Sequence, residues 1–170
     1  MFTKNWYKAL ASCLSRKAAP CIDAGGSERN LSVGYGWIGT GSSSDSYCPI
    51  GYVRTNLTGT AGFVAFGTGT TPPTLDDYTL SGNIVTGIST TAKVSGGFTD
   101  SGTEVSATYT ITNNNDTAVT IGEIGAFGAS GSTTGKGVML ERTVLESPIT
   151  IEPGGVGQVT YTLRCDIQTA

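Results

Sequence analysis

Apolar and polar residues alternate along much of the chain from Ala61 onward. In the clearest run, Val105, Ala107, Tyr109 and Ile111 are separated by Ser and Thr residues. Side chains on a β-strand point to opposite faces in turn, so this alternation predicts a strand with one buried and one exposed face. The same reasoning predicts strands over residues 61–66, 83–88, 91–98, 104–112, 117–125, 137–145, 148–152 and 156–166.

Turn-forming residues separate these runs. The segment Asn113–Asp116 consists of residues that tolerate left-handed backbone, and the alternation then resumes, which predicts a β-hairpin between 104–112 and 117–125. The segment Glu152–Gly155 predicts a similar hairpin between the last two strands. Short strands at regular spacing are typical of sandwiches and barrels. The expected fold class is therefore mainly β, with an Ig-like or jelly-roll-like β-sandwich over residues 61–170.

A different period occurs at the start of the chain. Apolar residues recur at every fourth position there, which predicts an amphipathic helix over residues 3–16 within an N-terminal region 1–20. A helix this short is marginal alone, so its apolar stripe must be covered. We expect the stripe either to pack on the chain's own body or to dock on a neighbouring subunit; its candidate interface residues are Phe2, Trp6, Tyr7, Leu10 and Leu14.

Residues 21–60 are rich in Gly, Ser and Asn and show little periodicity, so we expect an irregular segment. Residues Leu31–Ile38 are the exception and favour a short strand or hairpin. Aromatic side chains in this segment suit the faces of sugar rings, although they also suit the space beneath long loops. The candidate surface-binding aromatics are Tyr35, Trp37, Tyr47 and Tyr52.

Charge narrows the classes of partner. The chain has 170 residues and a net charge of −3, and four of its ten basic residues lie within residues 1–17, which contain no acid. The remainder has six basic against thirteen acidic residues, and this acidic balance argues against a nucleic-acid-binding surface. No stretch approaches the roughly 20 apolar residues that a membrane-spanning helix needs, so no membrane partner is expected.

The sequence offers little catalytic chemistry. It has no histidine, the commonest general base. The motif Gly34–Gly39 matches G-x-G-x-x-G but lacks a following helix, and Gly67–Thr71 lacks the lysine of a phosphate loop. The carboxylates Asp76, Asp77, Glu104, Asp116 and Glu123 show no metal-ligand spacing, and Asp76 or Asp77 is better explained as the cap of a short turn. We therefore expect no enzymatic activity, no cofactor and no metal site.

The four cysteines, Cys13, Cys21, Cys48 and Cys165, form no C-x-x-C pair. Free buried thiols are the favoured interpretation, and a Cys13–Cys21 disulfide remains the alternative.

Three parts of the sequence resemble a known class of protein. They are MFTKNWY at residues 1–7, FGTGTTPPTLDDYTL at 66–80, and the ending that runs from LERTV at 140–144 through PITIEPGG at 148–155 to VTYTL at 159–163. Together they resemble small virion structural proteins of tailed bacteriophages, and the ending also resembles Ig-like domains. The resemblance implies a capsid decoration, head fibre, neck or tail component, located in the virion, with no catalytic residues to carry over.

Two functions follow as expectations. The first is a homo-oligomeric virion subunit, assembled in the host cytoplasm, whose partners are other virion proteins. The alternative is an extracellular carbohydrate- or surface-binding Ig-like module, for which a host-surface glycan would be the ligand.

Overall fold

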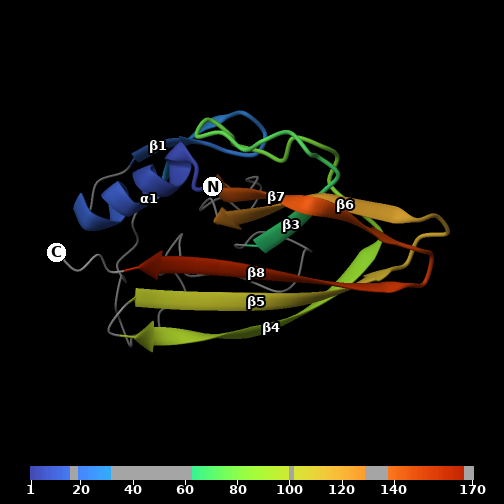
Figure 1. Cartoon of the computed structure of the whole chain (residues 1–170). Helices are drawn as coiled ribbons and strands as arrows, with labels where there is room; N and C mark the ends of the chain where they lie inside the picture. The colour runs from blue at the N-terminus through green and yellow to red at the C-terminus, as the bar shows by residue number, and fades with distance from the viewer. Residues whose placement is uncertain (16–18, 32–62, 100–101, 129–137, 167–170) are drawn as a thin grey trace, which may run out of the picture. The chain divides into compact units, whose positions relative to one another are not determined.

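The computed structural model describes residues 1–15, 19–31, 63–99, 102–128 and 138–166, and the described chain is mainly β with one short N-terminal helix (Figure 1). The predicted helix over 3–16 is confirmed within a residue at each end. The elements are α1 (Lys4–Ser15), β1 (Ala19–Ile22), β2 (Glu28–Leu31), β3 (Phe63–Gly67), β4 (Ile88–Thr99), β5 (Gly102–Asn113), β6 (Val119–Gly128), β7 (Val138–Ile151) and β8 (Val156–Asp166).

The chain divides into two compact units, and the first comprises Met1–Val85 and Thr120–Pro148. It contains the antiparallel pair β1–β2 and a sheet in the order β3-β6-β7. Strands β3 and β6 run antiparallel, in a register that places Phe63 opposite Phe127. One buried cluster joins α1 to β1 and β7 through Ala9, Cys21, Val138 and Leu140, and another contains Ala65, Leu80, Phe127 and Met139.

The second unit comprises Thr86–Val119 and Ile149–Ala170. Its sheet has the order β4-β5-β8, and both strand pairs are antiparallel (Figure 1). The alternation predicted for β5 is confirmed, because Ala107, Tyr109 and Ile111 are buried on one face. On the opposite face, hydroxyl groups pair across strands, for example Ser106 with Thr162 at 2.8 Å.

Both predicted hairpins are wrong. Strand β5 pairs with β4 and β8, whereas β6, which follows it in sequence, belongs to the sheet β3-β6-β7. Strands β7 and β8 likewise belong to different sheets. An antiparallel strand has only two edges, and β4 and β8 already occupy both edges of β5. The two turn segments therefore lead the chain from one sheet into the other.

Asn113 holds these two connections together in the second unit. Its side-chain amide donates to the carbonyl oxygens of Thr117 at 2.8 Å and Ile151 at 2.9 Å. Its backbone N–H donates to Gly155 at 3.0 Å, and its carbonyl accepts from Gly154 at 2.9 Å. Gly154 adopts a φ of 69°, which suits glycine. In a β-hairpin, backbone carbonyl groups near the turn would accept hydrogen bonds from the neighbouring strand. Here the side chain of Asn113 donates to such groups instead.

The structure differs from the predicted strands at three further places. The predicted strands 137–145 and 148–152 form the single strand β7, in which the exposed Pro148 is accommodated. Residues 83–88 form only an isolated bridge between Gly67 and Ile84 before β4 begins. The start of the segment expected to be irregular forms the β1–β2 pair. The remainder of the predicted strand Leu31–Ile38 lies outside the described residues, and the division into 1–20, 21–60 and 61–170 stays a prediction.

Candidate functional site

A cluster of three charged side chains lies inside the first unit. Arg142, on β7, is 1% exposed and Glu123, on β6, is fully buried. The Arg142 Nε donates to Glu123 Oε2 at 2.6 Å, and its Nη1 donates to Asp77 Oδ2 at 2.8 Å. One buried guanidinium thus bridges two carboxylates. Burying a charge is costly unless it is paired and hydrogen-bonded, and this arrangement meets both conditions.

The remaining polar atoms of the cluster bind the segment from Gly67 to Gly82. The Arg142 Nη2 donates to the carbonyl oxygen of Thr71 at 2.7 Å and to Ser81 Oγ at 2.6 Å. Glu123 Oε1 accepts from the backbone N–H groups of Gly69 at 3.1 Å and Gly82 at 2.7 Å. The cluster therefore stabilises both ends of a long loop that has little regular structure of its own.

The glycines of this loop are explained by close packing around Glu123. A Cβ on Gly69 would lie 2.3 Å from Glu123 Oε1, and one on Gly82 would lie 2.3 Å from the Gly69 nitrogen. Both distances are shorter than any real carbon contact. The Gly67–Thr71 motif therefore holds a buried carboxylate through its backbone, in agreement with the prediction that it is a structured loop.

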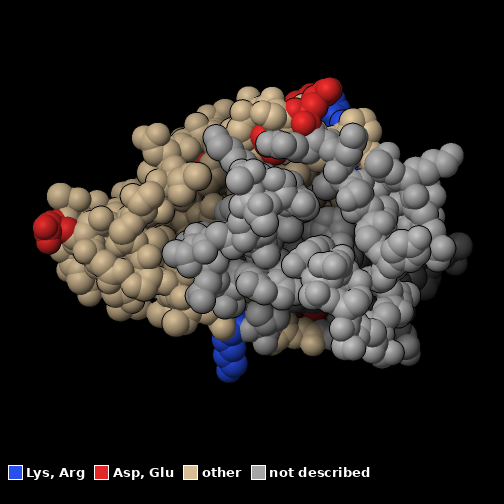
Figure 2. All heavy atoms as spheres, turned by 180° about the vertical axis from the view of Figure 1, so that it is seen from behind, with Lys and Arg blue, Asp and Glu red and all other residues tan. Residues whose placement is uncertain are grey.

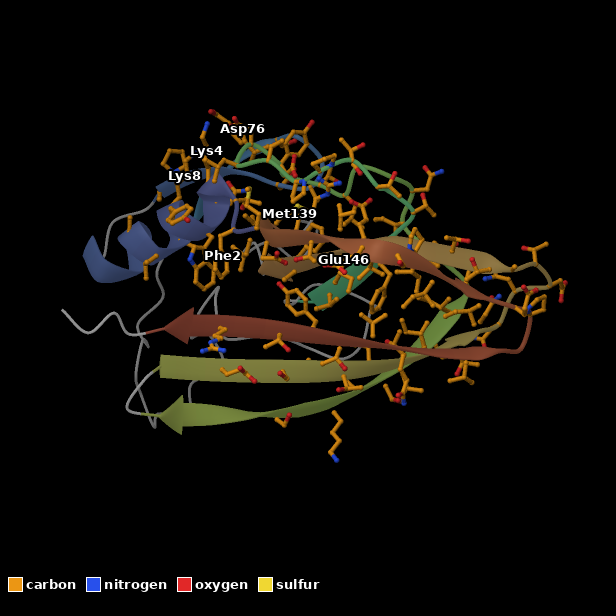
Figure 3. All side chains as sticks on the ribbon, in the orientation of Figure 1. Phe2, Lys4, Lys8, Asp76, Met139 and Glu146 are labelled. Atoms are coloured by element: carbon orange, nitrogen blue, oxygen red, sulfur yellow. The ribbon has the colours of Figure 1, made fainter. Side chains whose placement is uncertain are left out.

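Asp77 closes a turn at the outer part of the same loop. Its carboxylate accepts from the backbone N–H of Thr74 at 2.8 Å and from the Thr74 hydroxyl at 2.8 Å. This reproduces one half of a capping box and confirms the expectation that Asp76 or Asp77 caps a short turn. Asp76 instead forms an exposed ion pair with Lys4, and the two side chains meet in Figure 3.

The cluster keeps its charges at neutral pH. Burial raises the pKa of Glu123, but hydrogen bonds from Gly82 and Ser81 and the nearby Arg142 outweigh burial and bring the pKa below its ordinary value. Burial also raises the pKa of Asp77, but the hydrogen bonds from Thr74 and Arg142 outweigh burial and lower this pKa overall. Burial lowers the pKa of Arg142, yet the two carboxylates raise it overall. Each carboxylate is thus a fixed hydrogen-bond acceptor, which suits structural support better than proton transfer.

The N-terminal residues pack onto the same unit. The Thr3 N–H donates to the Leu140 carbonyl at 3.0 Å, and the Arg142 N–H donates to the Met1 carbonyl at 3.0 Å. With the bridge between Phe2 and Glu141, these contacts extend the sheet by a short antiparallel segment beside β7. The Lys4 N–H donates to the Leu75 carbonyl at 2.8 Å, which connects the start of α1 to the 67–82 loop.

The predicted stripe on α1 is buried only in part: Trp6 packs against the cluster of Ala9, Cys21, Val138 and Leu140. The most deeply buried residues of the described part of α1 are Asn5 and Ala9, because the Asn5 side chain exchanges two hydrogen bonds with the backbone of Ile22 and Ala9 allows close approach. Phe2 and Trp6 are half-buried and stack with ring centroids 4.5 Å apart.

Tyr7 and Leu10 are exposed, at 54% and 37%. The side chain of Leu14 lies outside the described residues. Docking through this stripe stays a prediction.

Other predicted site residues are not brought together. Tyr35, Trp37, Tyr47, Tyr52 and the Gly34–Gly39 motif lie outside the described residues. Glu104 and Asp116 are exposed residues of the second unit. Cys21 is buried, whereas Cys13, Cys48 and Cys165 are outside the described side chains.

Sequence reasoning missed the role of Arg142. The available signal was a charged pair, Glu141-Arg142, directly after the apolar run Val138–Leu140, which is an unusual setting for a solvated charge.

Within the described ranges, no group of His, Cys, Asp and Glu is arranged to hold a metal ion, and no helix is long and apolar enough to cross a membrane. A comparison with protein-family models finds no match, and comparisons with curated proteins and with solved structures find none either.

Proposed function

We propose that this chain is a non-enzymatic structural subunit of a tailed-phage virion, acting through protein–protein assembly as a capsid decoration, head fibre, neck or tail component. The observation that supports it most is the meeting, in one unit, of three segments that carry the resemblance. The first three residues pair with β7, residues 140–144 of β7 carry Arg142, and Arg142 binds the 66–80 segment. The sequence segments that carry the resemblance are therefore in contact with one another within one compact unit.

The surface is consistent with an assembly role. The described part of the face in Figure 2 is mostly uncharged, and its few charged side chains lie mainly toward its margins. Interfaces between proteins are depleted of charge at their centres. In this proposal the partners are other virion proteins and further copies of the chain, and the two sheets belong to an Ig-like or jelly-roll-like sandwich.

The direct test is electron microscopy of purified particles that carry a label at the C-terminus of this chain. We expect the label at one repeated position on head, neck or tail. The Arg142→Met variant, which we expect to destabilise the 67–82 loop, should show reduced incorporation, whereas Glu146→Met, at an exposed position of β7, should incorporate normally. A chain that is absent from particles and sediments separately would contradict the proposal.

A second candidate, a carbohydrate-binding module, is favoured by the hydroxyl-rich face of β5 and β8. Ser106, Thr108 and Thr110 meet Thr162, Thr160 and Gln158 across the two strands. Uncharged donors and acceptors in this arrangement suit sugar hydroxyls. A glycan array would test it, and binding that is lost in a Thr108→Val variant, which removes a hydroxyl from this face, would support the module.

A further inference from the structure

Strand β4 forms one edge of the sheet β4-β5-β8. Each residue from Ile88 to Thr99 pairs with a residue of β5, in an unbroken register without a bulge. The opposite side of β4 pairs with no strand in the part of the chain that the structure describes. An edge strand of this kind presents a row of backbone N–H and C=O groups that can pair with another strand.

The edge of β4 lacks the features that usually prevent such pairing. Proteins protect their edges with short strands, prolines, bulges or charges. The 12 residues of β4 include no proline and a single charged side chain, Lys93. By comparison, β3 has only five residues, and β8 carries Arg164 and Asp166 at its end.

This chain already covers one edge by adding a strand. The outer side of β7 receives the residues before α1, through the bridge between Phe2 and Glu141 and the backbone hydrogen bonds of Met1 and Thr3. Backbone pairing at a sheet edge is therefore a form of contact that the chain uses. In the described residues, no equivalent segment covers β4.

We propose that two copies of this chain pair through β4, antiparallel about a two-fold axis, so that their β4-β5-β8 sheets join into one continuous sheet. The inference rests on the proposed assembly function and names one of its contacts. Two-fold symmetry makes a strand pair with itself in antiparallel orientation, the slightly more stable arrangement.

The composition of β4 suits this self-pairing. Its exposed face carries Ser89, Thr91 and Ser95, the residue types that already pair across β5 and β8. Lys93 restricts the register, because like charges directly opposite each other are destabilising. Centres at Ala92 or Val94 place Lys93 opposite Thr91 or Ser95 of the second copy.

The size of this contact predicts a weak dimer. At about 3.3 Å per residue, 12 residues extend over about 40 Å, and an edge about 10 Å thick then buries on the order of 800 Å² in total. Stable interfaces bury more than this. We therefore expect a dimer that dissociates at micromolar concentration and is reinforced when copies are held close together in an assembly.

Sedimentation velocity of the full chain over a range of concentrations tests the proposal. We expect a reversible monomer–dimer equilibrium. The Thr91→Lys/Ser95→Lys variant should weaken it by about tenfold or more, because in either register one of the two added lysines lies directly opposite Lys93 of the second copy. The control is Thr160→Lys/Thr162→Lys, which adds the same charge to the same face at the β8 edge, and it should dimerise like the unmodified chain.

Hydrogen exchange locates the contact independently of the variants. Amides of β4 should exchange more slowly as the concentration of the unmodified chain rises, whereas those of β8 should not. A chain that stays monomeric at high concentration would overturn the proposal. A dimer equally weakened by the β8 control, or one without added protection in β4, would also overturn it.

The outcome is separable from that of the proposed function. Dimers that form through β4 in a chain absent from particles would contradict only the virion role. A chain found in particles but monomeric in solution at every concentration, with β4 amides unchanged, would contradict only the β4 contact.

Discussion

Arg142 connects several parts of the first unit. It joins β7 to Glu123 on β6 and to Asp77, Ser81 and Thr71 in the 67–82 loop. Such a cluster need not stabilise the folded state more than apolar side chains of the same volume would. The cost of desolvating the charges offsets much of the attraction between them. The significance of the cluster is that removing Arg142 leaves the buried charge of Glu123 without a counter-charge.

Replacing Arg142 by methionine should therefore be severe. We expect Arg142→Met to lower the free energy of unfolding by about 3–5 kcal/mol, since Glu123 would keep its charge in a buried position. Urea denaturation measures the change. Lys93→Met, at an exposed position, should stay within about 0.5 kcal/mol of the unmodified chain. A loss for Arg142→Met of under about 1 kcal/mol would show that the cluster is not buried as described.

Acid should weaken the same cluster. The pKa values of Glu123 and Asp77 lie below their ordinary values of 4.5 and 3.8, so the unfolded chain takes up protons before the folded chain does as the pH falls. The stabilisation is complete at neutral pH and is lost as the pH falls below about 4.5 and through the lowered pKa values. Denaturation between pH 7 and pH 3 should show this loss. The Asp77→Asn variant should show a shallower dependence, and an equal slope would exclude Asp77 as a contributor.

At the scale of elements, the connections between strands decide the topology. Asn113 is fully buried and bonds to both connections, whereas its neighbour Asn114 is exposed. The two residues have the same turn chemistry in the sequence. Only the fold assigns the joining role to one of them, because only Asn113 faces the carbonyl groups of Thr117 and Ile151.

This difference gives a matched pair of variants. We expect Asn113→Ala to lower the free energy of unfolding by about 2 kcal/mol or more, because the buried carbonyl group of Ile151 and the partly buried one of Thr117 lose their donor. Asn114→Ala should cost under about 1 kcal/mol. Thermal and urea denaturation of the two proteins compare them directly. Equal losses would indicate that the amide of Asn113 is replaced by water.

At the scale of the whole molecule, the chain forms two compact units, each assembled from two separate stretches of sequence. A strand continuing from one unit into the other, as β7 does, means that neither unit is a simple segment of the chain. Proteins often unfold locally in cooperative structural units, and each of the two compact units here is a candidate for such behaviour.

Hydrogen exchange of the two destabilised variants should show this division. We expect Arg142→Met to reduce protection first in β3, in β6 and in the 67–82 loop, which surround the cluster. Asn113→Ala should reduce it first in β4, β5 and β8. Mass spectrometry of peptides from each element measures both effects. A uniform loss of protection in either variant would mean that the chain unfolds as one cooperative unit.

The sequence by itself determined the local structure. The alternation at Ala107, Tyr109 and Ile111 predicts β5, and the four-residue period predicts α1, because these patterns arise from geometry within one element. The absence of a phosphate-loop lysine likewise predicted that Gly67–Thr71 is a structured loop. The pattern did not identify the most buried position of α1, because Asn5 is buried through its hydrogen bonds to Ile22 while Leu10 is exposed.

Only the tertiary structure decided which strands pair and which charges meet. The turn residues at Asn113–Asp116 and Glu152–Gly155 predict that the chain reverses, but a reversal into the same sheet and one into another sheet use the same residues. Arg142, Glu123 and Asp77 are distant in sequence, and their convergence depends on the pairing of strands and the path of the 67–82 loop. Such contacts have no local period, so no pattern in the sequence identifies them.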